Sequence, residues 1–175
     1  MKISSLLGLL SQARDLSGHT EFVVIGSLSI LGMEPVVEIP PGMSMSIDVD
    51  AYTRADPQRI FDLLAQLGED SPFHRAHGFY LDAVTPSLPT LPDGWEARML
   101  KIDQNGLRVW FLEPHDAAVS KLARLQPNDL RWVQEGVRAG LISVPLVRAR
   151  FAATQFLDSD EKQKAKLGLE QAASE

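Results

Sequence analysis

The chain has 175 residues, of which 45% are apolar and 23% charged, so it is long enough to bury one substantial core. Its formal net charge of -6 argues against a general electrostatic grip on nucleic acid or an anionic membrane, and the absence of cysteine excludes disulfides and thiolate metal sites. No apolar run approaches the roughly twenty residues of a membrane span, and the apolar stretch at 6–10 is too short for a secretory leader. We therefore expect a cytoplasmic protein without membrane contact.

The first residues of the chain predict a helix, a buried strand and a second helix. Apolar side chains recur at helical spacing over 3–16, and the run at 21–25 is apolar and mostly β-branched. Gly26-Ser27 then leads into a predicted helix over 28–33, followed by a brief extended piece at 36–39. This arrangement suits a phosphate, because glycine lets the backbone approach a ligand and a helix start offers free N–H groups. Gly-Ser is also common as an ordinary turn and helix cap.

Residues 46–52 read Ser-Ile-Asp-Val-Asp-Ala-Tyr and predict a strand with two acids on one face. Side chains alternate along a strand, so Asp48 and Asp50 project to one side while Ile47 and Val49 pack on the other. Two carboxylates held this close repel each other, and a hard divalent cation with oxygen ligands, usually Mg²⁺, relieves the repulsion. The same pair could instead be a solvated strand edge.

A third acid follows on the next predicted strand. Asp56-Pro57 has the pattern of a helix start, and the helix that it opens ends at Gly68, before an apolar strand over 79–84. That strand contains Asp82, which would join Asp48 and Asp50 if the two strands are neighbours. A buried acid usually has a partner, so Asp82 could also pair with one of two basic residues, Arg75 or Arg98.

The following segment predicts a rigid loop and a hairpin. Prolines at 86, 89 and 92 exclude a regular helix over 85–94. Strands are predicted over 97–102 and 107–112, joined around Asn105-Gly106, because Asn-Gly is a strong hairpin signal. Together with the earlier runs they give a short mixed sheet of about five strands.

Only helical patterns follow residue 113. Helices are predicted over 117–125, 130–139 and 144–156. The charged, Ala-rich stretch at 158–175 is compatible with either a helix or a frayed tail. We therefore expect an α/β domain over 1–113, a helical part over 114–157 packed on it, and acids that face a cleft between the two.

The combination of Gly26-Ser27, Asp48-x-Asp50 and a later helix with Lys121 resembles the nucleotidyltransferase superfamily of DNA polymerase β-like folds. Three further segments look like an uncharacterised bacterial family that is grouped with the nucleotidyltransferases of AbiEii-type toxin–antitoxin systems. These segments are His77–Asp82, Leu91–Arg98 and Pro114–Leu122. The likeness covers roughly residues 20–140.

This resemblance implies roles for seven residues. The acids Asp48 and Asp50 would bind Mg²⁺, with Asp82 as the third carboxylate. On the phosphate side the resemblance implies Gly26 and Ser27, together with Lys121 and Asp129 on the helical part. Relatives commonly have an Arg and a Thr just ahead of the acidic pair, whereas this chain has Gly-Met-Ser-Met-Ser at 42–46, which removes one cation from the site.

Two classes of function follow from these observations. The first is a Mg²⁺-dependent enzyme that transfers a nucleoside monophosphate from a nucleoside triphosphate to an acceptor, which could be a protein side chain, an RNA end or a small molecule. The second is a catalytically idle binding or regulatory protein with the same fold, as one half of a toxin–antitoxin pair. Lys121 has its own alternative, which is a surface ion pair with Asp116 or Glu113.

Overall fold

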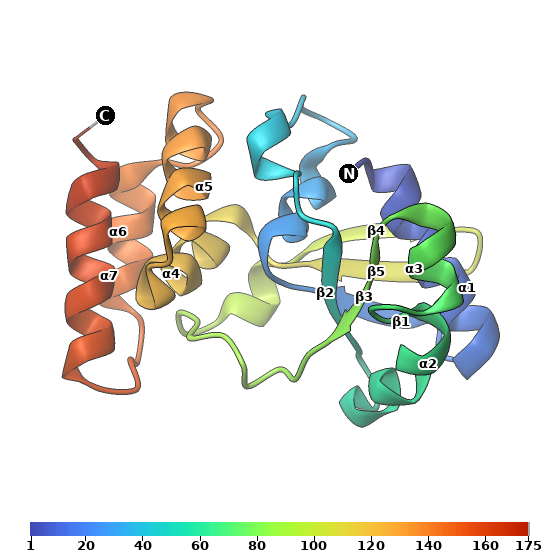
Figure 1. The fold of residues 1–175 in the computed structure, drawn as a ribbon. Coiled ribbons are helices and arrows are strands. Elements are labelled where there is room, and N and C mark those ends of the chain that lie inside the picture. Colours follow the sequence, from blue (N-terminus) through green and yellow to red (C-terminus); the bar gives the residue numbers. More distant parts are fainter. Residues whose placement is uncertain (175) are drawn as a thin grey trace.

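The structure is a computed structural model and describes residues 1–174. A five-stranded mixed sheet with helices around it lies beside a cluster of helices from the C-terminal part (Figure 1). The strands are β1 (Glu21–Val24), β2 (Asp48–Thr53), β3 (Tyr80–Ala83), β4 (Leu100–Gln104) and β5 (Leu107–Phe111). Their order in the sheet is β3-β2-β1-β5-β4, with parallel pairing for β2–β3 and β1–β5 and antiparallel pairing for β1–β2 and β4–β5.

The helices fall into two groups along the chain. The sheet part contains α1 (Ile3–Ser17), α2 (Leu64–Leu67), α3 (Pro72–His77) and four 3-10 helices, η1 (Ser27–Met33), η2 (Pro41–Met43), η3 (Pro57–Leu63) and η4 (Trp95–Arg98). The helical part contains α4 (Pro114–Arg124), α5 (Pro127–Arg138), α6 (Val144–Ala152) and α7 (Ser159–Ala172). Helix α4 contacts the other three helices of its group and also η1, so it joins the two groups. No helix among residues 1–174 combines the length and the apolarity that crossing a membrane requires.

The core forms where the central strands meet α1. Phe22 and Val24 of β1 and Phe111 of β5 are fully buried, because both faces of these strands are covered. Helix α1 buries Leu6, Leu9, Leu10 and Ala13, which recur at the spacing of one helix face. Burying such side chains stabilises the fold by roughly 1.5–3 kcal/mol each. The sheet that carries the acids therefore rests on a well-packed core.

The structure confirms the five-stranded mixed sheet with a helical C-terminal part, and it changes several boundaries. The predicted strand over 97–102 is wrong at its start, because Gly94 turns the chain at φ 74° into η4 and β4 begins only at Leu100. The extended piece at 36–39 forms no strand, and α3 was not predicted, although Ser71 caps it ahead of Pro72. The predicted helices at 28–33 and after Asp56 form, but largely as 3-10 helices.

The C-terminal stretch, for which helix and frayed tail were both open, forms α7 over most of its length. Asp158 caps this helix by accepting a hydrogen bond from the backbone N–H of Glu161 at 2.8 Å. Buried Ala165, Leu169 and Ala172 lie on the inner face of α7, which packs on α4.

Candidate functional site

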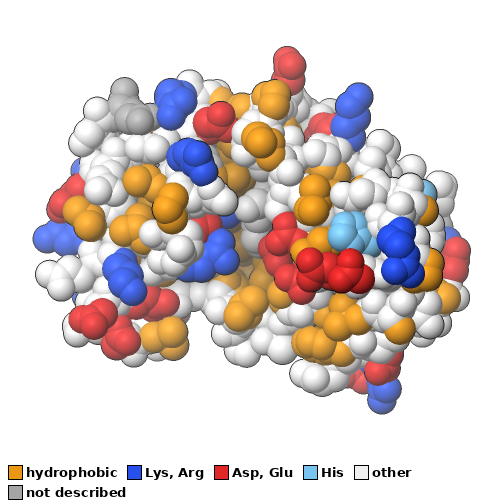
Figure 2. Space-filling model, viewed as in Figure 1, with side chains coloured by type: hydrophobic (Ala, Val, Ile, Leu, Met, Phe, Trp, Pro, Cys, Tyr) orange, Lys and Arg blue, Asp and Glu red, His pale blue; other side chains and the backbone are white. Residues whose placement is uncertain are grey.

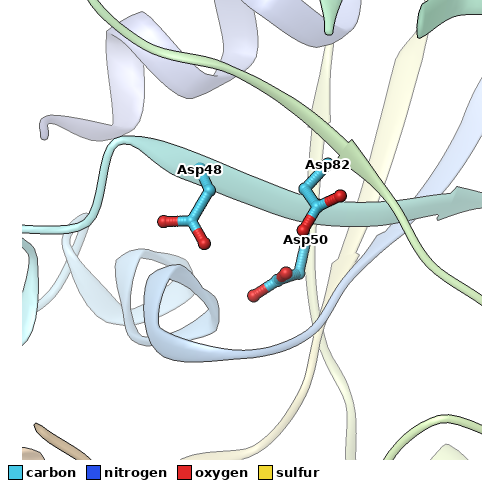
Figure 3. Close-up of side chains that lie close together, drawn as sticks. All are labelled: Asp48, Asp50 and Asp82. Carbon is cyan, nitrogen blue, oxygen red and sulfur yellow. The ribbon is translucent and has the colours of Figure 1, made fainter. Parts of the chain in front are cut away.

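Three carboxylates converge on neighbouring strands. Asp48 and Asp50 project from the same face of β2, and Asp82 lies opposite Asp50 in the parallel register of β3. One oxygen from each of the three lies within 4.8 Å of the others (Figure 3). The condition for Asp82 to join the pair is therefore met, since β2 and β3 are adjacent.

The electrostatics of this cluster favour a positive ligand. Burial, together with the charges of Asp48 and Asp82, raises the pKa of Asp50 to about 7. Burial and the charge of Asp48 also raise the pKa of Asp82. None of the three acids forms an ion pair within residues 1–174, and Asp82 pairs with neither Arg75 nor Arg98. An oxygen-only donor set with uncompensated negative charge fits a hard divalent cation such as Mg²⁺.

Gly26 lies directly against this cluster. Its φ is 68°, and a Cβ added at this position would lie 1.9 Å from Oδ2 of Asp50. The backbone N–H of Ile25 donates to the carbonyl of Asp50 at 3.0 Å, which fixes the approach. No residue with a side chain fits there unless Asp50 moves. The glycine of the Gly-Ser turn thus brings backbone to the acids.

Lys121 reaches the same place from α4. Its ammonium group donates to Oγ of Ser27 at 2.8 Å and to Asp129 at 3.3 Å, and the residue is only 5% exposed. Burial lowers the pKa of Lys121, and the charge of Asp129 opposes that shift. The alternative surface pair with Asp116 or Glu113 is not formed, because Asp116 is bound instead by Arg98 and Arg150.

Arg124 is a cation of the site that the sequence analysis did not identify. Its Nε and Nη2 donate to Asp129 at 2.7 and 2.6 Å, while the side chain remains 66% exposed. The hydrogen bonds to Asp129 raise the pKa of Arg124, and the charges of Asp50 and Asp48 add to this. A signal for it was present, since Arg124 follows Lys121 by three residues and such residues share a helix face.

Asp129 is the common ion-pair partner of Lys121 and Arg124. It is 1% exposed and accepts from Lys121, from Arg124 and from the backbone N–H of Gln126. Burial pushes the pKa of Asp129 up, but the bonds from Arg124 and the charge of Lys121 outweigh it, so the pKa is lowered. Asp129 therefore stays ionised and holds both cations in place.

A cleft of about 580 Å³ lies between the sheet part and the helical part, and of the three acids Asp50 lines it. Gly26 and Asp50 line it from the sheet part, and Lys121 and Arg124 line it from the helical part. The helical part also contributes Lys164 and three acids, Asp158, Asp160 and Glu161. Figure 2 shows this hollow, with acidic side chains gathered on the sheet side and basic ones across from them on the helical side. The cleft can accordingly take a ligand that carries both a metal ion and a strongly anionic group.

Comparison with known proteins identifies the family of the chain. The model of one protein family, described as nucleotidyltransferase of unknown function (DUF6036), matches residues 4–171. No curated protein and no solved structure matches the chain. Because the match spans nearly the whole chain, the protein belongs to this family of nucleotidyltransferases.

Proposed function

We propose that the protein is a Mg²⁺-dependent nucleotidyltransferase that transfers a nucleoside monophosphate from a nucleoside triphosphate to the hydroxyl group of an acceptor. One observation carries the proposal: three carboxylates converge, and one of them, Asp50, lies against Gly26 and lines a cleft together with Lys121 and Arg124. The acids suit the metal and the cations suit the phosphates, and phosphoryl transfer is catalysed chiefly by such positioning and charge neutralisation.

The residues would divide the work as follows. Asp48, Asp50 and Asp82 would hold Mg²⁺, which when bound neutralises and orients the triphosphate. Arg124 has guanidinium N–H groups beyond those bonded to Asp129, and these can donate to phosphate oxygens. Lys121 sits beside Ser27 at the Gly-Ser turn, where its charge offsets that of the leaving pyrophosphate. Attack at the α-phosphorus forms the new P–O bond and breaks the bond to the β-phosphate.

The acceptor hydroxyl must lose a proton during this attack. Asp82 lies on β3, the edge strand of the sheet, and burial and Asp48 raise its pKa. A carboxylate at the edge of the metal site can accept this proton, so Asp82 is our candidate general base.

The test is a label-transfer assay with each labelled nucleoside triphosphate, Mg²⁺ and cell extract. We expect label on a macromolecule with the parent protein and its loss in Asp48→Ala and Asp50→Ala, which should remain folded because a repulsive pair has been removed. Asp103→Ala is the matched control, because Asp103 is an exposed acid of the β4–β5 hairpin that pairs with Arg108. If Asp48→Ala and Asp50→Ala bind Mg²⁺-nucleotide as tightly as the parent, the proposal is wrong.

A second candidate is a catalytically idle protein of the same family that binds nucleotide or regulates a partner. It is favoured by Lys121, whose ammonium group already has Ser27 and Asp129 as partners, and by the lack of a cation at 42–46. Mg²⁺-nucleotide binding without label transfer to any component of the extract would select it.

The three sequence segments that resemble the AbiEii-type group support a further proposal, that this protein works with a cognate toxin or antitoxin. The check is coexpression with the product of an adjacent, overlapping reading frame. A stable complex, or suppression of toxicity, would support the pair, and unchanged growth without complex formation would oppose it.

A further inference from the structure

Two exposed leucines are among the residues that line the cleft. Leu88 is 66% exposed and Leu157 is 85% exposed, and both line the cleft that contains Asp50 and Lys121. Single exposed apolar side chains are ordinary on protein surfaces. Here, however, two of them come from segments far apart in the chain and line the same cleft, where they are an apolar pair among charged side chains.

The two leucine-bearing segments are fastened to each other before any ligand arrives. Glu161 accepts from the hydroxyl of Thr90 at 2.7 Å and from the backbone N–H of Leu157 at 2.7 Å. The backbone N–H of Asp93 also donates to the carbonyl of Ala153 at 2.8 Å, next to an isolated β-bridge. On the other segment, the N–H of Leu88 closes a turn on Thr85 at 3.1 Å. The backbone segments that carry the two leucines are therefore held together, which lowers the entropy cost of bringing both leucines to a ligand.

The cleft combines charged and apolar lining residues, as a nucleotide combines charged and apolar parts. Its lining includes Lys121 and Arg124 beside Asp50, which suits phosphates and a metal ion, and it also includes Leu88 and Leu157. The charged residues Asp158, Asp160, Glu161 and Lys164 of the helical part line the same cleft. A nucleoside triphosphate likewise has an anionic end and, beyond the ribose, a planar base whose faces are largely apolar.

We propose that Leu88 and Leu157 form a clamp for the nucleobase of the triphosphate substrate. This inference rests on the proposed function, since it places the phosphates at Lys121 and Arg124. Binding of a nucleobase through the faces of its ring depends on the apolar area that is covered more than on hydrogen bonds. The clamp therefore accepts any base and prefers purines, whose larger rings cover more of the two side chains.

The experiment compares the parent with the double variant Leu88→Ala/Leu157→Ala by isothermal titration calorimetry in Mg²⁺. The probes are ATP, GTP, CTP, UTP and inorganic tripolyphosphate, which has no base. We expect the parent to bind ATP roughly tenfold more tightly than tripolyphosphate, and purines more tightly than pyrimidines. The double variant should lose most of both differences while its affinity for tripolyphosphate stays unchanged.

Leu16→Ala is the matched control, because Leu16 is 53% exposed on α1 and does not line this cleft. It should leave every affinity unchanged. Circular dichroism checks that the double variant is folded, which is expected because both leucines are mostly in solvent.

The outcomes separate the clamp from the proposed function. If the double variant keeps the parent's preference for ATP over tripolyphosphate, the clamp is wrong while the transferase proposal stands. The clamp is equally wrong if nucleotide affinity is unchanged and only label transfer falls, because the leucines would then contact the acceptor. Conversely, ATP binding that depends on both leucines, with no tripolyphosphate binding and no label transfer, would keep the clamp and overturn the transferase.

Discussion

The acidic edge of the sheet and the basic group on the helical part carry opposite charges, and they differ in whether these charges have ion-pair partners. Asp48, Asp50 and Asp82 crowd together with no ion pair among residues 1–174. Across the cleft, Lys121 and Arg124 are already bound to the buried Asp129. The acids are thus arranged at the expense of the free protein's stability, whereas the cations are held in a stable network. This difference is what we expect if, as we propose, the acids bind a cation and the two basic residues are already held in position for its phosphates.

The largest expected effect is on the basic side. Asp129→Asn removes the charge that neutralises two cations, so it should lower the free energy of unfolding by roughly 3–5 kcal/mol. Denaturant unfolding measures this. The matched substitution Asp103→Asn breaks exposed ion pairs with Lys101 and Arg108 and should leave stability essentially unchanged. Equal effects of the two substitutions would show that the buried network does not stabilise the fold.

The next largest effect on stability is expected at the contact between the Gly-Ser turn and the acids. Gly26→Ala forces a Cβ to within 1.9 Å of Asp50 Oδ2 and adds strain at φ 68°. We expect a loss of roughly 2–4 kcal/mol and loss of the stabilisation that Mg²⁺ gives in thermal unfolding. Gly18→Ala isolates the strain alone, since Gly18 has φ 74° but no atom within 4 Å of an added Cβ. It should lower stability by only about 1 kcal/mol and leave the Mg²⁺ effect intact.

The pH dependence of stability tests the crowding of the acids. With its pKa raised from 3.8 to about 7, Asp50 keeps its proton in the folded protein where the unfolded chain has released it. Without metal, stability should therefore fall as the pH rises from about 4 to about 7, by on the order of 1–3 kcal/mol. Thermal unfolding across this range measures it. Asp50→Asn should flatten the profile, and Mg²⁺ should restore stability most at the high end, where the acids are ionised.

The smallest effect on stability is expected for Arg124→Gln, because the side chain of Arg124 is 66% exposed. Its removal should change the free energy of unfolding by less than about 1 kcal/mol. Affinity for tripolyphosphate should nevertheless fall about tenfold, since a charged donor to the phosphates is lost. Arg131→Gln on α5 is the control, because Arg131 contacts Asn128 and does not line the cleft. Unchanged affinity in Arg124→Gln would remove this residue from the phosphate site.

Much of the sheet was predictable because its signals are local. Alternation placed Asp48 and Asp50 on one face of β2, and Asn105-Gly106 does form the turn between β4 and β5, with positive φ at both residues. Gly26 was predicted to let the backbone approach a ligand, and its contact with Asp50 was not predicted, because it joins two separate strands. Asp82 too could be placed only conditionally, because strand order is set by long-range packing.

The helical side was harder to predict for the same reason. Lys121 and Asp129 came from the resemblance, while Arg124 acquires its role only when α4 turns that face toward the sheet. Likewise, Arg98 lies in η4 and not in the predicted strand, and it binds the fully buried Asp116 at 2.9 Å. No local sequence pattern predicts this ion pair. Charge networks between distant segments are what periodicity cannot show.

The connection from β3 to α7 has a mechanical consequence. The chain leaves β3 at Ala83, directly after Asp82, and Thr90 is already bound to Glu161 of α7. Prolines at 86 and 89 stiffen the stretch between these points. This stretch is a short, stiff connection between the sheet part and the helical part. We therefore expect a motion that widens the cleft to break the hydrogen bond between Thr90 and Glu161 or to pull on the strand that carries Asp82.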